Sequence, residues 1–148
     1  MNTPNQNDPG NIELRLRTMR ILWIALLMSI PIYCAFTLFV KRRAEPAPNR
    51  TLSLALLIAG AFATLISFAI KSTLLKKAAQ QQQVAMVQQG YIVTWAITEV
   101  AALLGMFDFF VTGNPYYYAL FIISALGMLL HFPSRDAVLN ASFKSQGF

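Results

Sequence analysis

One carboxylate lies inside a long apolar stretch of the sequence. The run "YIVTWAITEVAALLGMF" covers residues 91–107, and Glu99 stands close to its middle. A charged side chain at the centre of a membrane helix costs about 2.5 to 3.5 kcal/mol on insertion scales, so such a residue is by default a candidate functional group. A carboxyl group there can carry a proton or a cation, or it can hydrogen-bond between helices. Glu99 is therefore the proton-binding candidate of this chain.

Glu99 needs polar neighbours at its own depth in the membrane. It lies 8 residues after Tyr91, which is about 12 Å along a helix at 1.5 Å per residue. The same fractional depth in the other apolar runs places four hydroxyl residues at this level: Ser29, Thr64, Ser67 and Ser124. Burial disfavours the charged form of a carboxyl group, and a protonated Glu99 both donates and accepts hydrogen bonds. Two roles stay open, a structural tie between helices and a proton carrier.

The other ionisable residues in apolar surroundings, Asp108 and His131, are weaker functional candidates than Glu99. Asp108 follows Glu99 by nine residues, and we expect it at the membrane boundary, where water can solvate it. His131 stands beside Phe132 and Pro133 as an interfacial end residue, and no second ligand has a spacing that suits a metal. No Ser, Cys or His is placed with partners for nucleophilic chemistry, and no phosphate loop is present. We expect no enzyme, no cofactor and no metal site.

The composition indicates a membrane protein. Of 148 residues, 56% are hydrophobic and 12% are charged, and the mean hydropathy is +0.51; this exceeds what a soluble core of that size can bury. The net charge of +6 comes from Lys and Arg at the ends of apolar runs. These residues form no basic face with interleaved aromatic residues, which argues against nucleic acid as a partner. The single cysteine, Cys34, excludes an intramolecular disulfide.

Four apolar runs predict four transmembrane helices. They cover residues 19–40, 52–70, 91–111 and 116–132, and each is near the ~20 residues that span the hydrocarbon core, although the last is short. The sequence therefore predicts an all-α polytopic protein with a small four-helix bundle at 19–132. Residues 1–18 form a polar tail and a helical lead-in, with disorder expected over 1–10. Residues 133–148 form a short C-terminal tail.

The distribution of Lys and Arg predicts the orientation. Eight of them lie in the N-terminal tail, the second connection and the C-terminal tail, against four in the first connection, "KRRAEPAPNR". Because cytoplasmic segments carry the excess of positive charge, both termini should be cytoplasmic, and the first connection opposes this assignment. We expect an integral protein of a bacterial inner membrane.

Small residues indicate which helices pack closely. In lipid, helices associate through close backbone approach, so small residues spaced by four mark the contact faces. The predicted packing positions of the second and third spans are Ala59, Gly60, Ala63, Ala101 and Gly105. The connection "KSTLLKKAAQQQQVAMVQQG" consists of good helix formers up to Gly90. The two spans should therefore extend into a long helical hairpin.

Residues 52–111 also resemble a known family. An apolar span with small residues, a polar "AAQQQQ" connection and then "IVTWAITEVAALLGMFDFF" are similar to the proteolipid c subunit of rotary ATP synthases, with Ala96, Glu99 and Gly105 matching the motif of its second helix. The resemblance implies that Glu99 carries the proton and that the polar connection contacts a rotor stalk. The chain departs from the family in having only Gly60 in the preceding span, no Arg-Gln-Pro loop and two further spans.

Two functions follow from these patterns. The first is an accessory or structural subunit that packs in a larger membrane complex or with itself, with Glu99 as an interhelical polar contact. The alternative is a proton-linked transport or rotor-like proteolipid subunit with Glu99 as the proton-binding carboxylate. In both, the partners are the lipid bilayer and other membrane subunits, and nucleic acid is not a partner.

Overall fold

The computed structural model describes residues 9–40 and 49–142, and every regular element in them is a helix. The elements are α1 (Pro9–Phe39), α2 (Arg50–Gln81), α3 (Val84–Val111), the 3-10 helix η1 (Pro115–Tyr117), α4 (Tyr118–Leu130) and α5 (Arg135–Ser142). The all-α prediction is confirmed. Most of residues 1–10 and of the charged connection lies outside the described residues, so the predicted disorder is not addressed there.

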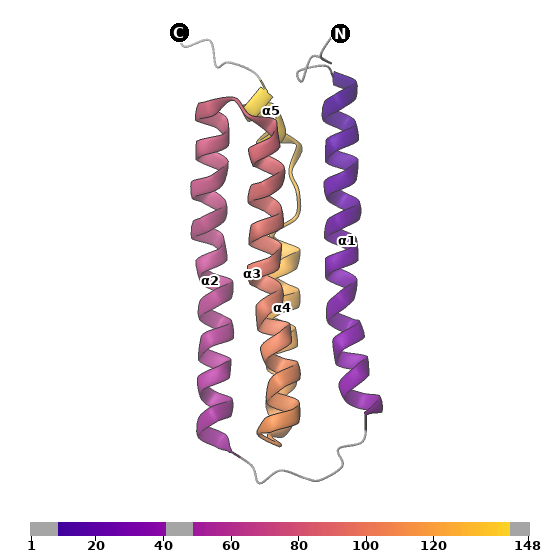
Figure 1. Cartoon of the computed structure of the whole chain (residues 1–148), viewed down its shortest axis with the longest axis vertical. Coiled ribbons are helices and arrows are strands. Elements are labelled where there is room, and N and C mark those ends of the chain that lie inside the picture. The colour runs from indigo at the N-terminus through magenta and orange to yellow at the C-terminus, as the bar shows by residue number, and fades with distance from the viewer. Residues whose placement is uncertain (1–8, 41–48, 143–148) are drawn as a thin grey trace.

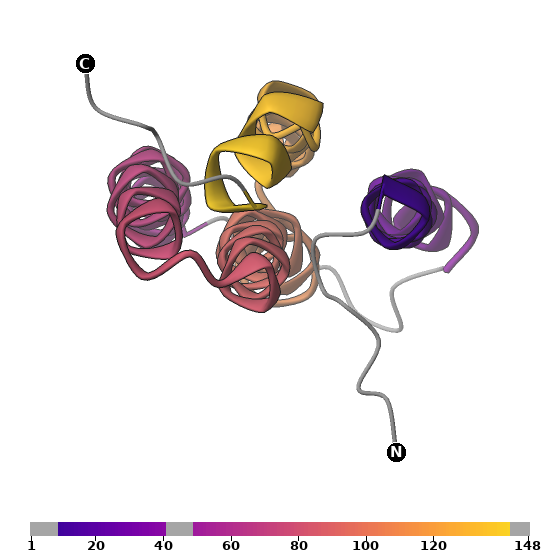
Figure 2. The same ribbon diagram turned by 90° about the horizontal axis from the view of Figure 1, so that it is seen from above.

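Helix α3 lies at the centre of the bundle. Figures 1 and 2 show α2 and α1 on opposite sides of α3, with α4 packed beside it as the fourth member. The most extensive interface joins α2 and α3, which confirms that these two spans form the closest pair. Helix α1 begins at the end of the bundle where α5 lies (Figure 1).

The hairpin between α2 and α3 turns within two residues. Gln82 adopts the left-handed conformation, with φ of 52°, and its backbone N–H donates to the carbonyls of Ala78 and Ala79. This geometry closes the C-terminus of α2. The long helical hairpin is confirmed, and Gly90 lies inside α3. A Cβ at Gly90 would lie 3.2 Å from Leu74 Cβ, so the glycine lets α2 and α3 approach each other.

Within the described residues, three helices are long and apolar enough to cross a membrane, namely Ile12–Phe39, Arg50–Gln81 and Val84–Val111. The fourth candidate span is a pair, Pro115–Leu130 and Arg135–Ser142, bent by 47° at the break between them. Helix α4 alone has 13 residues, about 20 Å of helix against roughly 30 Å of hydrocarbon. Pro133 follows its end and cannot continue the helix. These elements fit an integral membrane protein.

Two tryptophans cap the C-terminal end of α4. Trp23 Nε1 donates to the Met128 carbonyl at 2.8 Å, and Trp95 Nε1 donates to the His131 carbonyl at 3.0 Å. The last carbonyls of a helix lack the usual partner four residues on, and in lipid they need one from elsewhere in the protein. The Met128 carbonyl also accepts from the His131 backbone N–H at 3.1 Å. Trp95 is fully buried rather than placed at the lipid interface. The two indoles therefore tie α1 and α3 to the end of α4.

Close backbone approach is made at glycines on three helices. A Cβ at Gly60 would overlap Leu120 Cδ2 of α4 and lie 3.4 Å from Ala101 Cβ of α3. A Cβ at Gly105 would lie 3.0 Å from Leu120 Cβ. These positions are buried, so three of the predicted packing residues lie at helix contacts. Leu120 of α4 fills the space that the glycines leave.

The remaining predicted packing positions differ. Ala63 is half-buried, and Ala59 is exposed because it precedes Gly60 by one residue and therefore points about 100° away from it. Gly127 of α4 is not among the predicted packing positions, but it leaves as little room for a side chain as Gly60 does. A Cβ there would lie 2.6 Å from Thr64 Cγ2 and 2.7 Å from Thr98 Cγ2. Gly127, and not Ala59, therefore lies at a close helix contact.

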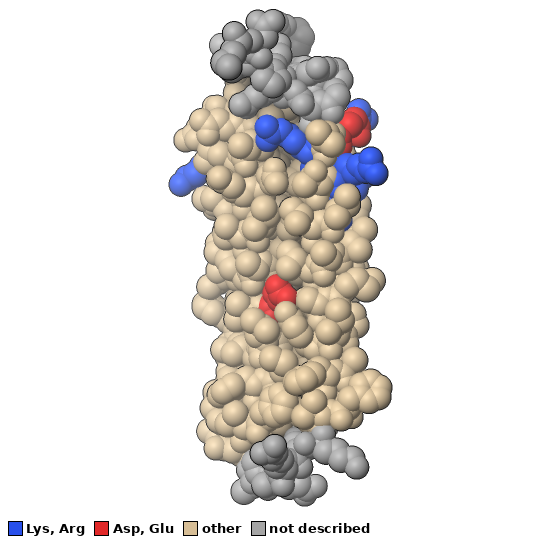
Figure 3. Space-filling model, turned by 45° about the vertical axis from the view of Figure 1, so that its right-hand side comes forward, with Lys and Arg blue, Asp and Glu red and all other residues tan. Residues whose placement is uncertain are grey.

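The outer surface of the bundle is apolar over most of its length. On the face in Figure 3, Lys and Arg gather near one end, and the long band beyond them is uncharged except for an acidic side chain at mid-height. Large apolar side chains are exposed on every long helix, for example Leu38 on α1, Leu65 on α2 and Phe107 on α3. Such a surface is stable against lipid and costly against water.

Gly60 should be less tolerant of change than a lipid-facing leucine. Gly60→Leu forces a side chain into the space of Leu120, and overpacking of this kind costs about 1 to 3 kcal/mol. Leu54→Ala removes a side chain that is 56% exposed and should change the free energy of unfolding little. Thermal unfolding of both variants in the same detergent checks this, and equal melting temperatures would contradict it.

Candidate functional site

Glu99 lies on the side of α3 that faces α1. Ser29 Oγ lies 2.6 Å and Tyr33 OH 2.9 Å from Glu99 Oε1, and both hydroxyls come from α1. Ser29 and Tyr33 are four residues apart, so they stand one above the other on the same face of α1. Glu99 is half-buried. The carboxyl group therefore joins α1 to α3 near the middle of the bundle.

The contacts of Glu99 accommodate both of its protonation states. When Glu99 is ionised, both hydroxyls donate to Oε1. Ser29 Oγ also lies 2.7 Å from the Leu26 carbonyl, and a hydroxyl has one proton and two lone pairs. When Glu99 is protonated, Ser29 can donate to Leu26 and accept from Glu99. Either state keeps its hydrogen bonds without moving a helix.

Three of the four predicted neighbours of Glu99 belong to a different cluster. Ser29 does bond to Glu99, but Thr64, Ser67 and Ser124 have their hydrogen bonds elsewhere. Thr64 Oγ1 donates to the Gly60 carbonyl at 3.0 Å, and Ser124 Oγ donates to the Thr98 carbonyl at 2.9 Å. Ser67 Oγ donates to the Thr64 carbonyl at 2.6 Å. The expectation of one polar cluster at this depth is corrected to two.

The two clusters share a depth but lie on different faces of α3. Thr98 faces α2 and α4, since its hydroxyl lies 3.3 Å from Ser67 Oγ and its carbonyl accepts from Ser124. Glu99 is the next residue and points about 100° away, toward α1. Depth along a helix does not fix the direction of a side chain. The direction separates these residues.

Tyr33 is the contact that sequence reasoning missed. Matching depths along the helices selects the small hydroxyl residues at the level of Glu99, whereas Tyr33 lies one turn further along its helix. A tyrosine hydroxyl stands several ångströms from its own backbone, so it can reach a different level. The signal available in the sequence was the spacing of four between Ser29 and Tyr33, which places two donors on one helix face.

His131 lies in the protein interior, which corrects the expectation of an interfacial end residue. Its side chain is 0% exposed, and Nε2 lies 2.9 Å from Ser67 Oγ. Its ring packs edge-on against Phe68, with centroids 4.2 Å apart. Since Ser67 Oγ donates to the Thr64 carbonyl, its lone pairs are left to accept from His131 in the tautomer that carries its proton on Nε2. The pair links α2 to the end of α4.

Asp108 is also buried, which corrects its placement at a solvated boundary. It is 2% exposed, and Ser53 Oγ donates to Oδ2 at 2.8 Å while Thr112 Oγ1 donates to Oδ1 at 2.5 Å. Asn114 Nδ2 in turn donates to Ser53 Oγ at 2.7 Å. These side chains hold the start of α2 to the end of α3. Sequence position gave the level of Asp108 but not its inward direction.

The described residues contain no group of three or more His, Cys, Asp or Glu side chains that could hold a metal ion. The Ser67–His131 pair resembles part of a nucleophilic site in its atoms, but both side chains are 0% exposed. A substrate cannot reach them without separating α2 from α4. The arrangement at Glu99 can hold two helices together or exchange a proton.

Compared with known proteins, the chain matches no family model, no curated protein and no solved structure. The likeness of residues 52–111 to a proteolipid subunit therefore rests on the motif around Glu99 alone.

Proposed function

We propose that this membrane protein is an accessory or structural subunit of a larger membrane complex, in which Glu99 is an interhelical contact that fixes α1 on α3. The observation that carries the proposal is that Ser29 and Tyr33 of α1 both bond to one oxygen of Glu99. Its partners are other membrane subunits or a second copy of the chain, and its role is not enzymatic.

The placement of α1 supports a packing role. Helix α1 packs on α3, α4 and α5, and its buried apolar side chains lie mainly in its first half, at Ile12, Leu16 and Met19. Beyond them it is largely exposed, with Ile32 at 64% and Leu38 at 71%. Holding α1 at a set angle therefore presents a wide apolar face beside the compact α2–α3–α4 unit. Such a face can pack against lipid or a neighbouring membrane subunit.

A proton-linked function is the second candidate, and one observation favours it. The hydrogen bonds around Glu99 fit both protonation states, because Ser29 can turn its proton to the Leu26 carbonyl. Glu99 is also half-buried rather than sealed inside the protein. A carboxyl group that gains and loses a proton without a helix movement suits a proton carrier.

Glu99→Gln separates the two functions. If Glu99 is a structural contact, the amide keeps a donor and an acceptor, and the change in unfolding free energy should stay within the average of about 0.6 kcal/mol for a membrane hydrogen bond. Glu99→Leu should cost about 1 kcal/mol, because Tyr33 loses its acceptor, whereas Ser29 keeps the Leu26 carbonyl. Unfolding in detergent measures both, with Glu13→Gln as the control at an exposed surface ion pair. A silent Glu99→Leu would contradict the structural role.

The proton-linked function predicts a different result. Glu99→Gln should then fold and insert normally but abolish proton flux in proteoliposomes, because an amide cannot titrate. Dicyclohexylcarbodiimide should label Glu99 in the native protein, since it modifies protonated, lipid-accessible carboxyl groups. Normal flux in a well-folded Glu99→Gln protein would exclude this function.

We further propose a bacterial inner membrane with both ends of the chain in the cytoplasm. In support, the first residues of α1, the α2–α3 turn and α5 share one end of the bundle (Figure 1). Lys and Arg gather there: Arg15, Arg17, Arg20, Lys71, Lys76, Lys77 and Arg135. This asymmetry follows the positive-inside rule.

Labelling tests the orientation directly. A cysteine introduced by Asn114→Cys, in a chain that also carries Cys34→Ser, should react with a membrane-impermeant maleimide added from outside intact cells. Asn114 lies at the end of the bundle opposite the basic cluster. Labelling only after the cytoplasmic side is opened would reverse the assignment.

A further inference from the structure

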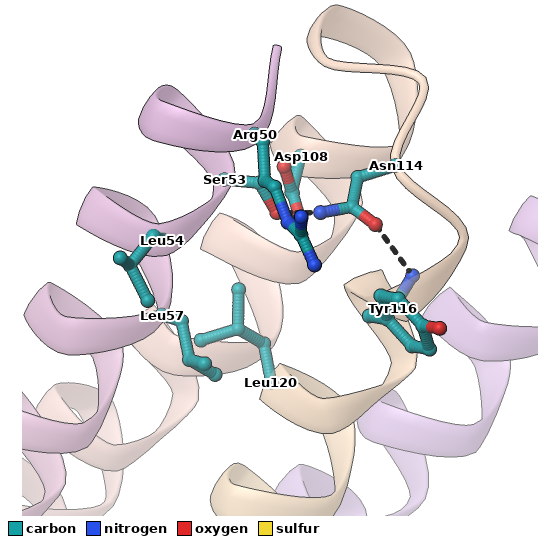
Figure 4. Close-up of a pocket in the computed structure, with 8 residues that line it drawn as sticks. All are labelled: Arg50, Ser53, Leu54, Leu57, Asp108, Asn114, Tyr116 and Leu120. Carbon is teal, nitrogen blue, oxygen red and sulfur yellow. Dashed lines mark hydrogen bonds between the residues drawn. The ribbon is translucent and has the colours of Figure 1, made fainter. Parts of the chain in front are cut away.

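A pocket of about 290 Å³ lies at the end of the bundle opposite the basic cluster, between the start of α2 and the η1–α4 segment. Figure 4 shows its lining, which includes Arg50, Ser53, Leu54, Leu57, Asp108 and Leu120. The site proposed above for Glu99 uses none of these residues. The pocket is small for a complete lipid but large enough for a headgroup and the beginning of a chain.

Two opposite charges line this pocket without pairing. The one ion pair among the described residues joins Arg135 to Glu13, so Arg50 and Asp108 are not bonded to each other. Among the described residues, the Asp108 side chain accepts hydrogen bonds from the neutral hydroxyls of Ser53 and Thr112, and no Lys or Arg pairs with it. A buried carboxylate is costly unless a cation compensates it. The floor of the pocket therefore suits a cationic group.

Arg50, at the open end of the pocket, favours an anionic group. It is exposed and is the first residue of α2, where the helix dipole disfavours a cation and favours an anion. A phosphate at this position would gain charge-assisted hydrogen bonds from the guanidinium and the favourable field of the helix N-terminus. The lining thus places an anion-binding group and a cation-binding group within one cavity.

The polarity of the pocket changes along the helix axes. Figure 4 shows Arg50, Asp108 and Asn114 grouped at one end, with Leu54, Leu57 and Leu120 beyond them. Leu54 and Leu57 follow Arg50 by four and seven residues, about 6 and 10 Å deeper along the helix. This is the order of headgroup and acyl chain in a lipid leaflet. Leu54 is 56% exposed, so the apolar end opens toward lipid.

We propose that this pocket binds a zwitterionic phospholipid with a primary ammonium, with its phosphate at Arg50, its ammonium at Asp108 and an acyl chain along Leu54, Leu57 and Leu120. A primary ammonium carries three N–H donors for the lone pairs that Asp108 leaves free. A trimethylated ammonium has none. A headgroup with only negative charge would meet the uncompensated Asp108 carboxylate.

Native mass spectrometry of the full chain tests the proposal. The protein is purified in detergent and given phosphatidylethanolamine, phosphatidylglycerol and phosphatidylcholine of identical chains in equal amounts. We expect one phosphatidylethanolamine to be retained. Arg50→Gln should weaken its retention about tenfold, the loss of one charge-assisted contact. Arg17→Gln, an exposed arginine at the other end of the bundle, should leave it unchanged.

A second pair of variants tests the apolar part. Leu54→Trp should fill the groove and abolish retention, whereas Ile58→Trp, on the same helix and 61% exposed, lies outside the pocket and should not. Asp108→Asn should remove the preference for the primary ammonium. Because Asp108 also holds α2 to α3, the melting temperature of the Asp108→Asn protein is measured as well. If that protein unfolds, the Arg50→Gln and Leu54→Trp variants and their controls decide the outcome.

Three results would overturn the proposal. The first is equal retention by Arg50→Gln and the unchanged chain. The second is a preference for phosphatidylglycerol or phosphatidylcholine. The third is displacement of the lipid by soluble glycerophosphoethanolamine at the same concentration, because the acyl chain would then contribute nothing. None of these results depends on the role of Glu99, so the two proposals fail separately.

Discussion

Polar side chains in the apolar part of this bundle have to find their hydrogen-bond partners within the protein, because lipid offers none. This constraint organises the structure around α3. One face of α3 meets α2 and α4 through Gly105, Ala101 and the hydroxyl of Thr98. The adjacent face carries Glu99, which bonds to α1. The central helix thus packs closely on α2 and α4, with a hydrogen bond from Thr98, and bonds to α1 through Glu99.

The same constraint explains the short fourth helix. Helix α4 ends near His131, and its last carbonyls would be costly to leave unpaired in lipid. Trp23 and Trp95 donate to two of them, and the His131 side chain bonds back to Ser67. The break between α4 and α5 is therefore enclosed by partners from all three long helices. A residue that looked interfacial in the sequence is part of the interior.

Much of the architecture could be predicted from the sequence, whereas the site could be predicted only in part. The long helices could be predicted from the apolar runs and the helix-forming connection, because the length and hydrophobicity of a segment can be read from that segment alone. Glu99 and Ser29 were identified because their depth follows from residue counts. Tyr33, the inward direction of Asp108 and the separation of Ser67 from Glu99 depend on how each helix is rotated about its axis. That rotation is set by Gly60, Gly105 and Gly127 meeting neighbouring helices, which no single helix reveals.

The central claim is that the contact between Tyr33 and Glu99 holds α1 to α3, and a double-mutant cycle tests it most directly. The unfolding free energies of the unchanged chain, Tyr33→Phe, Glu99→Leu and the double variant are measured in one detergent, with Tyr118→Phe as the exposed tyrosine control. If the two side chains interact, the coupling energy should be favourable and about 0.6 kcal/mol, with an upper range of about 1.7 kcal/mol. Strictly additive effects of Tyr33→Phe and Glu99→Leu would show that the two side chains do not interact, and would contradict the central claim.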